Sequence, residues 1–194
     1  MSRQMRNHLN HGGDSMKLTA RRIPDQFIRA IPRGFRLVKK QGHDFLLIES
    51  LFCPNGHNLV VDSVRIHDEA SIKLKVVIDD ESGFLFVDAF WGSHAKLFSF
   101  IPKSSGKEPV FAETHCPYCD ASMIEHYACT QKGCGSEKGV LLMLPGGENK
   151  IHVCARLGCP GHVLDIKDLP REIVRSVSVI NYFGAGADDP FGGV

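Results

Sequence analysis

The residues of this chain whose types and spacing could do chemistry are its seven cysteines and one neighbouring histidine. Six cysteines occur as close pairs, and the seventh is followed by a histidine in the motif CPNGH. The resulting pairs are Cys53 with His57, Cys116 with Cys119, Cys129 with Cys134, and Cys154 with Cys159. Thiolate and imidazole are ligands that Zn²⁺ binds in tetrahedral structural sites. The eight ligands therefore predict two four-coordinate zinc ions per chain, and zinc is the cofactor that we expect.

Disulfide bonds are the competing use of these cysteines. No apolar run approaches the roughly 20 residues that cross a bilayer, and the segment MSRQMRNHLNHGGDSM lacks the apolar core of a secretory signal. We therefore expect a cytoplasmic protein with no membrane partner. A reducing compartment disfavours disulfides, and an odd number of cysteines fits full pairing poorly. Metal binding is the favoured interpretation.

The first predicted zinc site is formed by Cys116, Cys119, Cys129 and Cys134. A CPxC turn, here within HCPYCDASM, can direct two thiolates at one ion, and a hairpin can bring back a second pair. The stretch from Cys116 to Cys134 resembles the zinc ribbons, in which a CPxC knuckle and a second cysteine-bearing turn hold one ion. It departs from them in its second pair, which is CxxxxC where CxxC is commoner. The resemblance implies a closed structural site.

The second predicted zinc site is formed by Cys53, His57, Cys154 and Cys159. The motif HVCARLGC repeats the spacing of YACTQKGC, but no CxxC precedes it nearby. The motif LFCPNGH supplies the missing pair, with a proline placed as in CPYC. Such a site would join positions about a hundred residues apart. It would contribute several kcal/mol to folding, because the unfolded chain binds metal far less well.

Two alternatives for these sites stay open at the level of sequence. His162, in the motif CPGH, could replace His57 or Cys159, since CxxH is also a sound zinc-binding pair. Iron in a rubredoxin-like four-cysteine site could replace zinc.

Strands are expected to position most of these ligands. Segments of alternating or continuous apolar character flank turn sequences such as KQGHD, DDESG and PGGEN, which predicts antiparallel hairpins. The predicted strands are FRLV (35–38), FLLIESLF (45–52), SIKLKVVI (71–78), FLFVDAFW (84–91), KLFSFI (96–101), PVFAE (109–113), VLLML (140–144), KIHVC (150–154) and HVLDI (162–166).

Helix is expected at two places. The segment DQFIRAI, residues 25–31, predicts one or two helical turns that Pro32 ends. The segment LPREIVRSVSVINYF has apolar residues near helical spacing, which predicts a C-terminal helix within residues 167–183. The expected fold class is α+β and mainly β, with antiparallel hairpins, two zinc-ribbon-like structural metal sites and a short C-terminal helix.

The domain organisation follows from the same patterns and from charge. Residues 1–40 carry ten Lys or Arg and two Asp, whereas the remaining residues carry 13 basic and 20 acidic side chains. The predicted parts are a flexible basic arm (1–22), a β-rich domain with the first half of a zinc site (23–115), a zinc-ribbon-like region packed on it (116–166), the C-terminal helix (167–183) and a flexible tail (184–194). A basic arm is suited to docking on nucleic acid or on an acidic protein surface.

Enzymatic motifs are weak. There is no HExxH, no GxSxG and no glycine-rich phosphate loop, and His67 with Glu69 and the Cys116 pair only faintly resembles the nucleobase deaminases. We predict a non-enzymatic, zinc-stabilised binding module or accessory subunit of a larger protein assembly, with a protein partner. One alternative is a nucleic-acid-binding protein that uses residues 1–40. The other is a metal-dependent enzyme with an open zinc site held by Cys53, Cys154 and Cys159.

Overall fold

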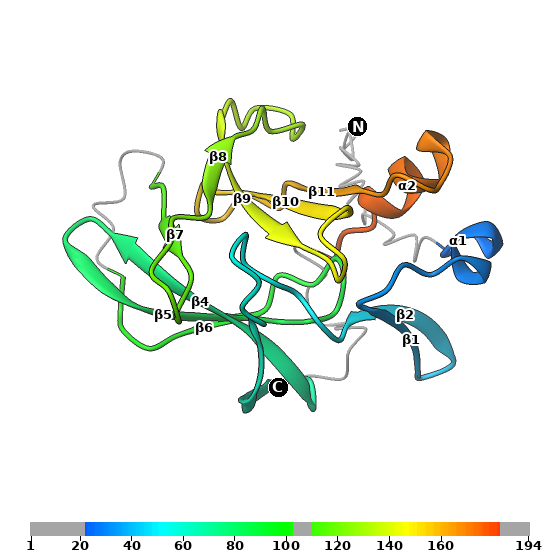
Figure 1. Ribbon diagram of the computed structural model, residues 1–194, viewed down its shortest axis with the longest axis horizontal. Coiled ribbons are helices and arrows are strands. Elements are labelled where there is room, and N and C mark those ends of the chain that lie inside the picture. Colours follow the sequence, from blue (N-terminus) through cyan, green and yellow to red (C-terminus); the bar gives the residue numbers. More distant parts are fainter. Residues whose placement is uncertain (1–21, 103–109, 183–194) are drawn as a thin grey trace, which may run out of the picture.

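The computed structural model describes residues 22–102 and 110–182 of the 194 in the chain. Within these residues, eleven antiparallel strands form three sheets, and there are two helices (Figure 1). The strands are β1 (Phe35–Lys40), β2 (His43–Ile48), β3 (Val60–Ile66), β4 (Glu69–Ile78), β5 (Glu81–Val87), β6 (Lys96–Phe98), β7 (Glu113–His115), β8 (Ile124–His126), β9 (Lys138–Met143), β10 (Lys150–Cys154) and β11 (His162–Asp165). The helices are α1 (Asp25–Arg29) and α2 (Arg171–Ser178).

The five-stranded sheet is built around β4. One edge of β4 pairs with β5, and its other edge is shared by β3 at one end and β7 at the other. Side chains alternate along β4, so Leu74 and Val76 are buried on the inner face, whereas Lys73 and Lys75 lie on the outer face. β6 pairs with β5 and forms the edge of this sheet among the described residues.

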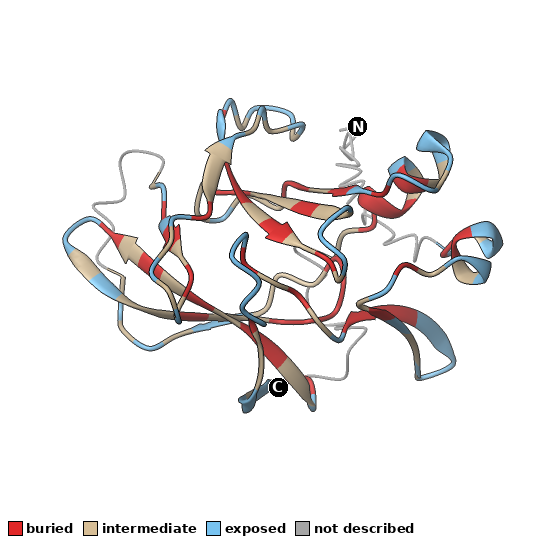
Figure 2. Ribbon diagram, in the orientation of Figure 1, coloured by how far each residue is buried: buried red, intermediate tan, exposed pale blue. Residues whose placement is uncertain are grey.

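The four-stranded sheet has the strand order β11-β10-β9-β8. Its residues Leu142 and Ile151 lie opposite one another on neighbouring strands and are buried. They belong to the same core cluster as Leu74 and Val76 of the other sheet. Figure 2 shows the buried segments of the two sheets facing a common interior. A single core therefore joins the sheets and fixes the position of the loops at their ends.

Short bridges connect the third sheet, the hairpin β1–β2, to the other two. Leu47 of β2 pairs with Phe90, in the loop that follows β5. Phe52, just after β2, exchanges two hydrogen bonds of 2.8 Å with Met143 at the end of β9. The segment that carries Cys53 is thereby held against the four-stranded sheet.

Helix α2 packs against the sheet through its buried residues Val174 and Val177. The indole Nε1 of Trp91 donates a hydrogen bond of 2.8 Å to the carbonyl of Val177. The amide of Tyr182 donates to the carbonyl of Gly92, also at 2.8 Å. The chain after Ser178 therefore hydrogen-bonds to the loop after β5. The helix ends at Ser178 because these hydrogen bonds replace those that a further helical turn would make.

The predicted mainly β, antiparallel architecture with a C-terminal helix is confirmed. The helix is shorter than the predicted residues 167–183, and β3, β7 and β8 were not predicted. The boundaries of the predicted β-rich and zinc-ribbon-like domains stay a prediction. The predicted arm, apart from Arg22, and the predicted tail lie outside the described residues.

Candidate metal centres

The structure gathers the eight predicted ligands into two groups, each of which could hold a metal ion. Within each group, all ligand atoms lie within 4.8 Å of one another. The Cys53 cluster consists of Cys53, His57, Cys116 and Cys119, and the Cys129 cluster consists of Cys129, Cys134, Cys154 and Cys159. The predicted division of the pairs between two sites is therefore wrong: the Cys116 pair joins the Cys53 pair, and the two CxxxxC pairs join each other.

Two tight turns supply the Cys53 cluster. In the first, the amide of Gly56 donates to the carbonyl of Cys53 at 2.9 Å, and Gly56 takes a φ of 86°, which favours glycine. In the second, the amide of Asp120 donates to the carbonyl of Cys116 at 3.0 Å. Both turns close on themselves, so each directs its two ligands to the same side.

Hydrogen bonds to sulfur prepare this cluster for thiolate. The amide of His57 donates to Cys53 Sγ and the amide of Tyr118 donates to Cys116 Sγ, each at 3.4 Å. The amide of Ala121 and the side chain of Asn55 lower the pKa of Cys119 to about 6. Burial instead raises the pKa of Cys116. A cation is the partner that would allow both sulfurs to ionise together.

The spacing of Cys53 and His57 fits a tetrahedral ion. Sulfur at about 2.3 Å and nitrogen at about 2.05 Å from one zinc ion lie about 3.5 Å apart in a regular tetrahedron. The observed distance between Cys53 Sγ and His57 Nδ1 is 3.5 Å. His57 is exposed and stacks on Tyr118, with ring centroids 6.0 Å apart.

The Cys129 cluster is built from two copies of one turn. The amide of Cys134 donates to the carbonyl of Gln131 at 3.1 Å, and the amide of Cys159 donates to the carbonyl of Arg156 at 3.1 Å. The glycine before each second cysteine has nearly the same φ, 79° for Gly133 and 77° for Gly158. This conformation matches a type II turn, which requires glycine at that position.

The backbone around the two turns also repeats. The amide of Cys129 donates to the carbonyl of Ser136, and the amide of Cys154 donates to the carbonyl of Gly161, both at 2.8 Å. The first cysteine of each turn therefore lies in the same hydrogen-bonded loop. The two halves of the cluster therefore share the same local backbone structure.

The sulfur atoms of the Cys129 cluster have the separations of a zinc tetrahedron. Four sulfurs about 2.3 Å from an ion lie about 3.8 Å from one another. Cys129 Sγ and Cys159 Sγ lie 3.7 Å apart, and Cys134 Sγ and Cys154 Sγ lie 3.6 Å apart. Disulfide sulfurs would be about 2.05 Å apart. All seven cysteines are free thiols in this structure.

The pKa values of the thiols in the Cys129 cluster differ from one another. Burial raises the pKa of Cys134, but the amide of Ser136 and the neighbouring sulfurs outweigh it and bring that pKa to about 7. Burial raises the pKa of both Cys129 and Cys159. The guanidinium of Arg156 is held near the cluster by its hydrogen bond of 2.8 Å to the carbonyl of Cys134. Here too a divalent cation is what would stabilise four thiolates.

Strand pairing explains why the ligands divide in this way. The bridge between His115 and Ser122 closes the Cys116–Cys119 turn, and β8 then carries the chain away from it. The hairpin β9–β10 places Cys154 opposite Gly139, close to the loop that ends at Ser136. The signal that could have revealed this was the shared CxxxxC spacing with glycine before the second cysteine, which marks equivalent halves of one site.

This geometry decides two of the alternatives that the sequence left open. His162 belongs to neither cluster, and its Nε2 lies 3.0 Å from the carbonyl oxygen of Ile180. The open site of Cys53, Cys154 and Cys159 is wrong, because Cys53 lies in the other cluster. Sequence analysis missed Asn55, whose side chain donates to Cys119 Sγ at 3.4 Å.

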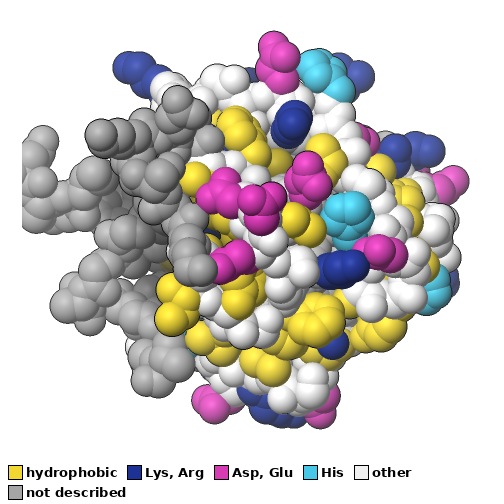
Figure 3. All heavy atoms as spheres, turned by 90° about the vertical axis from the view of Figure 1, so that its left-hand side faces the viewer, with side chains coloured by type: hydrophobic (Ala, Val, Ile, Leu, Met, Phe, Trp, Pro, Cys, Tyr) yellow, Lys and Arg dark blue, Asp and Glu magenta, His cyan; other side chains and the backbone are white. Residues whose placement is uncertain are grey.

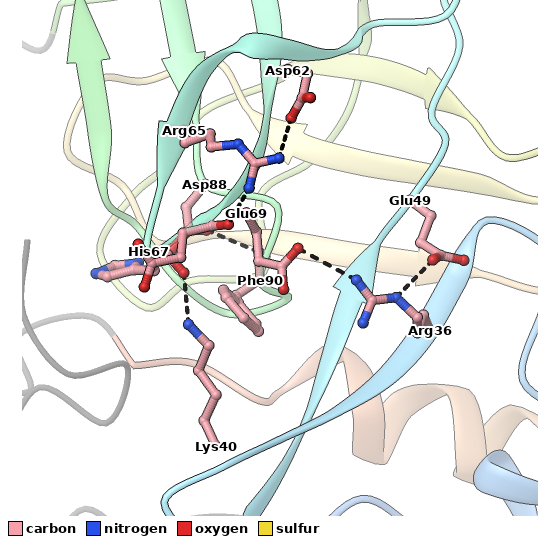
Figure 4. A network of polar contacts seen from close by, with 10 residues as sticks. Arg36, Lys40, Glu49, Asp62, Arg65, His67, Glu69, Asp88 and Phe90 are labelled. Carbon is pink, nitrogen blue, oxygen red and sulfur yellow. Dashed lines mark hydrogen bonds and ion pairs between the residues drawn. The ribbon is translucent and has the colours of Figure 1, made fainter.

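A separate polar network surrounds the turn between β3 and β4 (Figure 4). His67 Nδ1 lies 2.7 Å from a carboxylate oxygen of Asp88, and both side chains are almost fully buried. Asp88 also accepts hydrogen bonds from the hydroxyl of Ser93 and the amide of Phe90. A catalytic triad places the imidazole, rather than the carboxylate, against the serine. The network therefore anchors the β3–β4 turn to the loop after β5.

Comparisons with known proteins do not supply a family. The chain matches no protein-family model and has no match among curated proteins or among solved structures. Among the described residues, neither helix has the length and apolar character that a transmembrane helix requires.

Proposed function

We propose that this protein is a non-enzymatic binding module that holds two structural zinc ions and serves as an accessory subunit of a larger protein assembly. The observation that carries the proposal is the geometry of the two clusters, each of which offers four ligand atoms within 4.8 Å. Four protein ligands leave no position for water or substrate, whereas catalytic zinc sites retain one.

The metal ions would act by fixing loops. Each cluster joins two separate turns, and apart from Cys154, the last residue of β10, the ligands lie outside the strands and helices. Metal binding to folded protein contributes folding free energy, because the unfolded chain binds it far less well. Loops held in this way lose less conformational entropy when a partner binds.

The outer side of the five-stranded sheet supports a protein partner. Figure 3 shows one face of the molecule on which hydrophobic side chains are interspersed with positive and negative side chains. Leu97 of the edge strand β6 is 47% exposed and Ile101, just beyond it, is 86% exposed. An apolar surface with both signs of charge fits a protein surface better than the phosphate backbone of a nucleic acid.

The test is affinity purification of tagged protein from its native source, with Leu97→Glu/Ile101→Glu as the variant. The matched control is Val179→Glu, directly after helix α2, where Val179 is 45% exposed. We expect a stoichiometric protein that is lost from the double variant and retained by the control, with metal content unchanged in both. A partner that both variants retain would contradict the assigned surface, and purification without any partner would contradict the accessory role.

The predicted contribution of the basic arm to partner binding can be tested in the same purification. Because Ile23 is buried and Phe35–Lys40 form β1, only residues 1–21 can be removed without cutting into the described fold. Loss of the partner on removal of residues 1–21 is the result expected if the arm contributes to docking. If the full chain binds neither single-stranded nor duplex nucleic acid at low salt, the nucleic-acid alternative is ruled out. Binding that is lost when residues 1–21 are removed would support it.

A further inference from the structure

An apolar cavity of about 150 Å³ lies between the inner faces of the two large sheets. Leu74 and Leu85 line it from the five-stranded sheet, and Leu142 and Ile151 line it from the four-stranded sheet. Protein cores are packed with few voids larger than a water molecule, and an apolar cavity of this size can hold a benzene-sized molecule. The cavity therefore has the volume and the lining of a ligand site.

One side of the cavity is polar. Lys96 on β6 pairs directly with Val87 on β5, so both side chains lie on the inner face, and both line the cavity. Lys96 is exposed at the mouth, and it has no ion pair with any residue that the structure describes. The ammonium group is thus available to a ligand.

The carboxylate of Asp88, which lines the cavity, already accepts hydrogen bonds from protein groups. Asp88 is the acidic residue of the cavity lining, and it accepts hydrogen bonds from His67, Ser93 and the amide of Phe90. The imidazole of His94 also lines the cavity, and burial together with the charge of His162 lowers its pKa to about 4. His94 is therefore neutral at neutral pH and adds no positive charge. Arg156 also lines the cavity, so Lys96 and Arg156 together outweigh Asp88 by one positive charge, and this balance favours one anionic group.

We propose that this cavity binds a small organic acid whose hydrocarbon or aromatic body, of roughly six to eight carbon atoms, fills the space between the sheets, with its carboxylate at Lys96. Such a site is independent of the protein partner proposed above, because Leu97 and Ile101 lie outside it. It adjoins the Cys129 cluster, since Cys154 and Cys159 form part of the cavity wall.

The experiment uses the metal-loaded full chain and two probes, phenylacetate and its uncharged analogue phenylacetamide. Binding is measured by isothermal titration calorimetry. Native mass spectrometry is performed first, so that any acid retained during purification is detected. The variants are Lys96→Gln, which removes the charge, and Val87→Phe, which fills the mouth from a half-buried position. The matched control is Lys73→Gln, on the outer face of the same sheet.

We expect Val87→Phe to lose both probes and any retained acid. Lys96→Gln should weaken phenylacetate by roughly tenfold, as expected when a charge-assisted contact is lost, and leave phenylacetamide unchanged. Lys73→Gln should behave like the natural protein. Circular dichroism and metal content verify that each variant is folded.

Two results would overturn the inference. An empty protein that binds neither probe has no such site, and equal binding by the natural protein and Val87→Phe places the probe elsewhere. An inward-facing lysine on an edge strand can also serve only to block strand-to-strand association. In that case Lys96→Gln changes self-association but not the affinity for phenylacetate, and the anionic specificity is wrong.

Discussion

The sulfur atom of Cys129 lies 3.7 Å from the sulfur atom of Cys159, thirty residues further along the chain. Each belongs to a CxxxxC turn, and the two turns have the same hydrogen bond and the same glycine conformation. The turns are therefore halves of one candidate metal centre rather than parts of two. Removing either half should release the same ion.

The division of ligands can be tested by counting metal ions in paired variants. Cys53→Ser/Cys119→Ser removes two ligands of one cluster and should leave one zinc ion per chain. Cys53→Ser/Cys159→Ser removes one ligand from each cluster and should abolish or weaken both ions, since structural sites need their four ligands. Native mass spectrometry of protein purified under reducing conditions measures the number of ions.

The opposite pattern would identify the division predicted from sequence. If Cys53 and Cys159 bound the same ion, the Cys53/Cys159 variant would retain one ion and the Cys53/Cys119 variant would lose both. Ser122→Ala, near the Cys53 cluster but not a ligand, is the control and should retain two.

Removal of the metal should destabilise the fold. Chelation leaves closely spaced thiols whose loops have few other restraints, and structural zinc contributes several kcal/mol or more to folding. We expect the melting temperature of chelator-treated protein to fall by at least about 10 °C, and to recover when zinc is restored. An unchanged melting temperature in protein that elemental analysis finds free of metal would contradict a structural role.

Trp91 should be a major contributor to the stability of the C-terminal helix. Its indole donates to the carbonyl of Val177 at 2.8 Å, and its ring contacts Phe35 edge-on. Trp91→Phe removes that donor and leaves space, so we expect a loss of about 2 kcal/mol in the free energy of unfolding. Tyr118→Phe, at a site 54% exposed, is the control and should change stability by less than about 0.5 kcal/mol. Urea denaturation measures both.

Asp88 should be essential to the loop after β5. Its carboxylate accepts hydrogen bonds from His67, the hydroxyl of Ser93 and the amide of Phe90. Asp88→Ala removes the acceptor of these three hydrogen bonds and should cost about 3 kcal/mol or more. Asp62→Ala, which removes only an exposed pair with Arg65, should cost less than about 1 kcal/mol. Similar losses in the two variants would mean that burial does not strengthen the Asp88 network.

His94 should make stability depend on pH in the mildly acidic range. Burial and the charge of His162 lower its pKa from 6.5 to about 4 in the folded protein. The unfolded chain therefore binds more protons between these values, so the contribution of neutral His94 is complete above pH 6.5 and is lost as pH falls towards 4. His94→Gln should show a shallower decline in the free energy of unfolding over that range.

Acid also releases metal from thiolates and thereby lowers stability in both proteins. The prediction therefore concerns the difference between the natural protein and His94→Gln. The comparison is made at equal metal occupancy, with His43→Gln, on the exposed turn end of β2, as the control. Parallel curves for the natural protein and His94→Gln would show that His94 titrates normally.

Local pattern was sufficient for the strong hairpins. The β4–β5 hairpin was predicted because Leu74 and Val76 alternate with lysines before a turn and an aromatic-rich apolar segment follows it. The alternation places one face of β4 in the core. The three strands that were missed have little such signal. β7 and β8 have three residues each, and they exist because β4 and β9 offer them partners.

The same distinction holds for the ends of α2. Helical spacing within LPREIVRSVSVINYF predicted the helix, but not that it would stop at Ser178. The stop depends on Gly92, whose carbonyl accepts the amide of Tyr182, and on Trp91. Both lie in a distant loop, so no local pattern within the helix could indicate them.

For the metal centres, the sequence by itself determined the chemistry: thiols and an imidazole at spacings that tight turns can direct at one ion. Only the tertiary structure decided which turns share an ion. Any two pairs satisfy the requirement for four ligands, but a metal accepts only sulfurs that approach within about 4 Å of one another. That approach is set by the pairing of β7 with β4, of Phe52 with Met143 and of β9 with β10, which place the eight side chains in two groups.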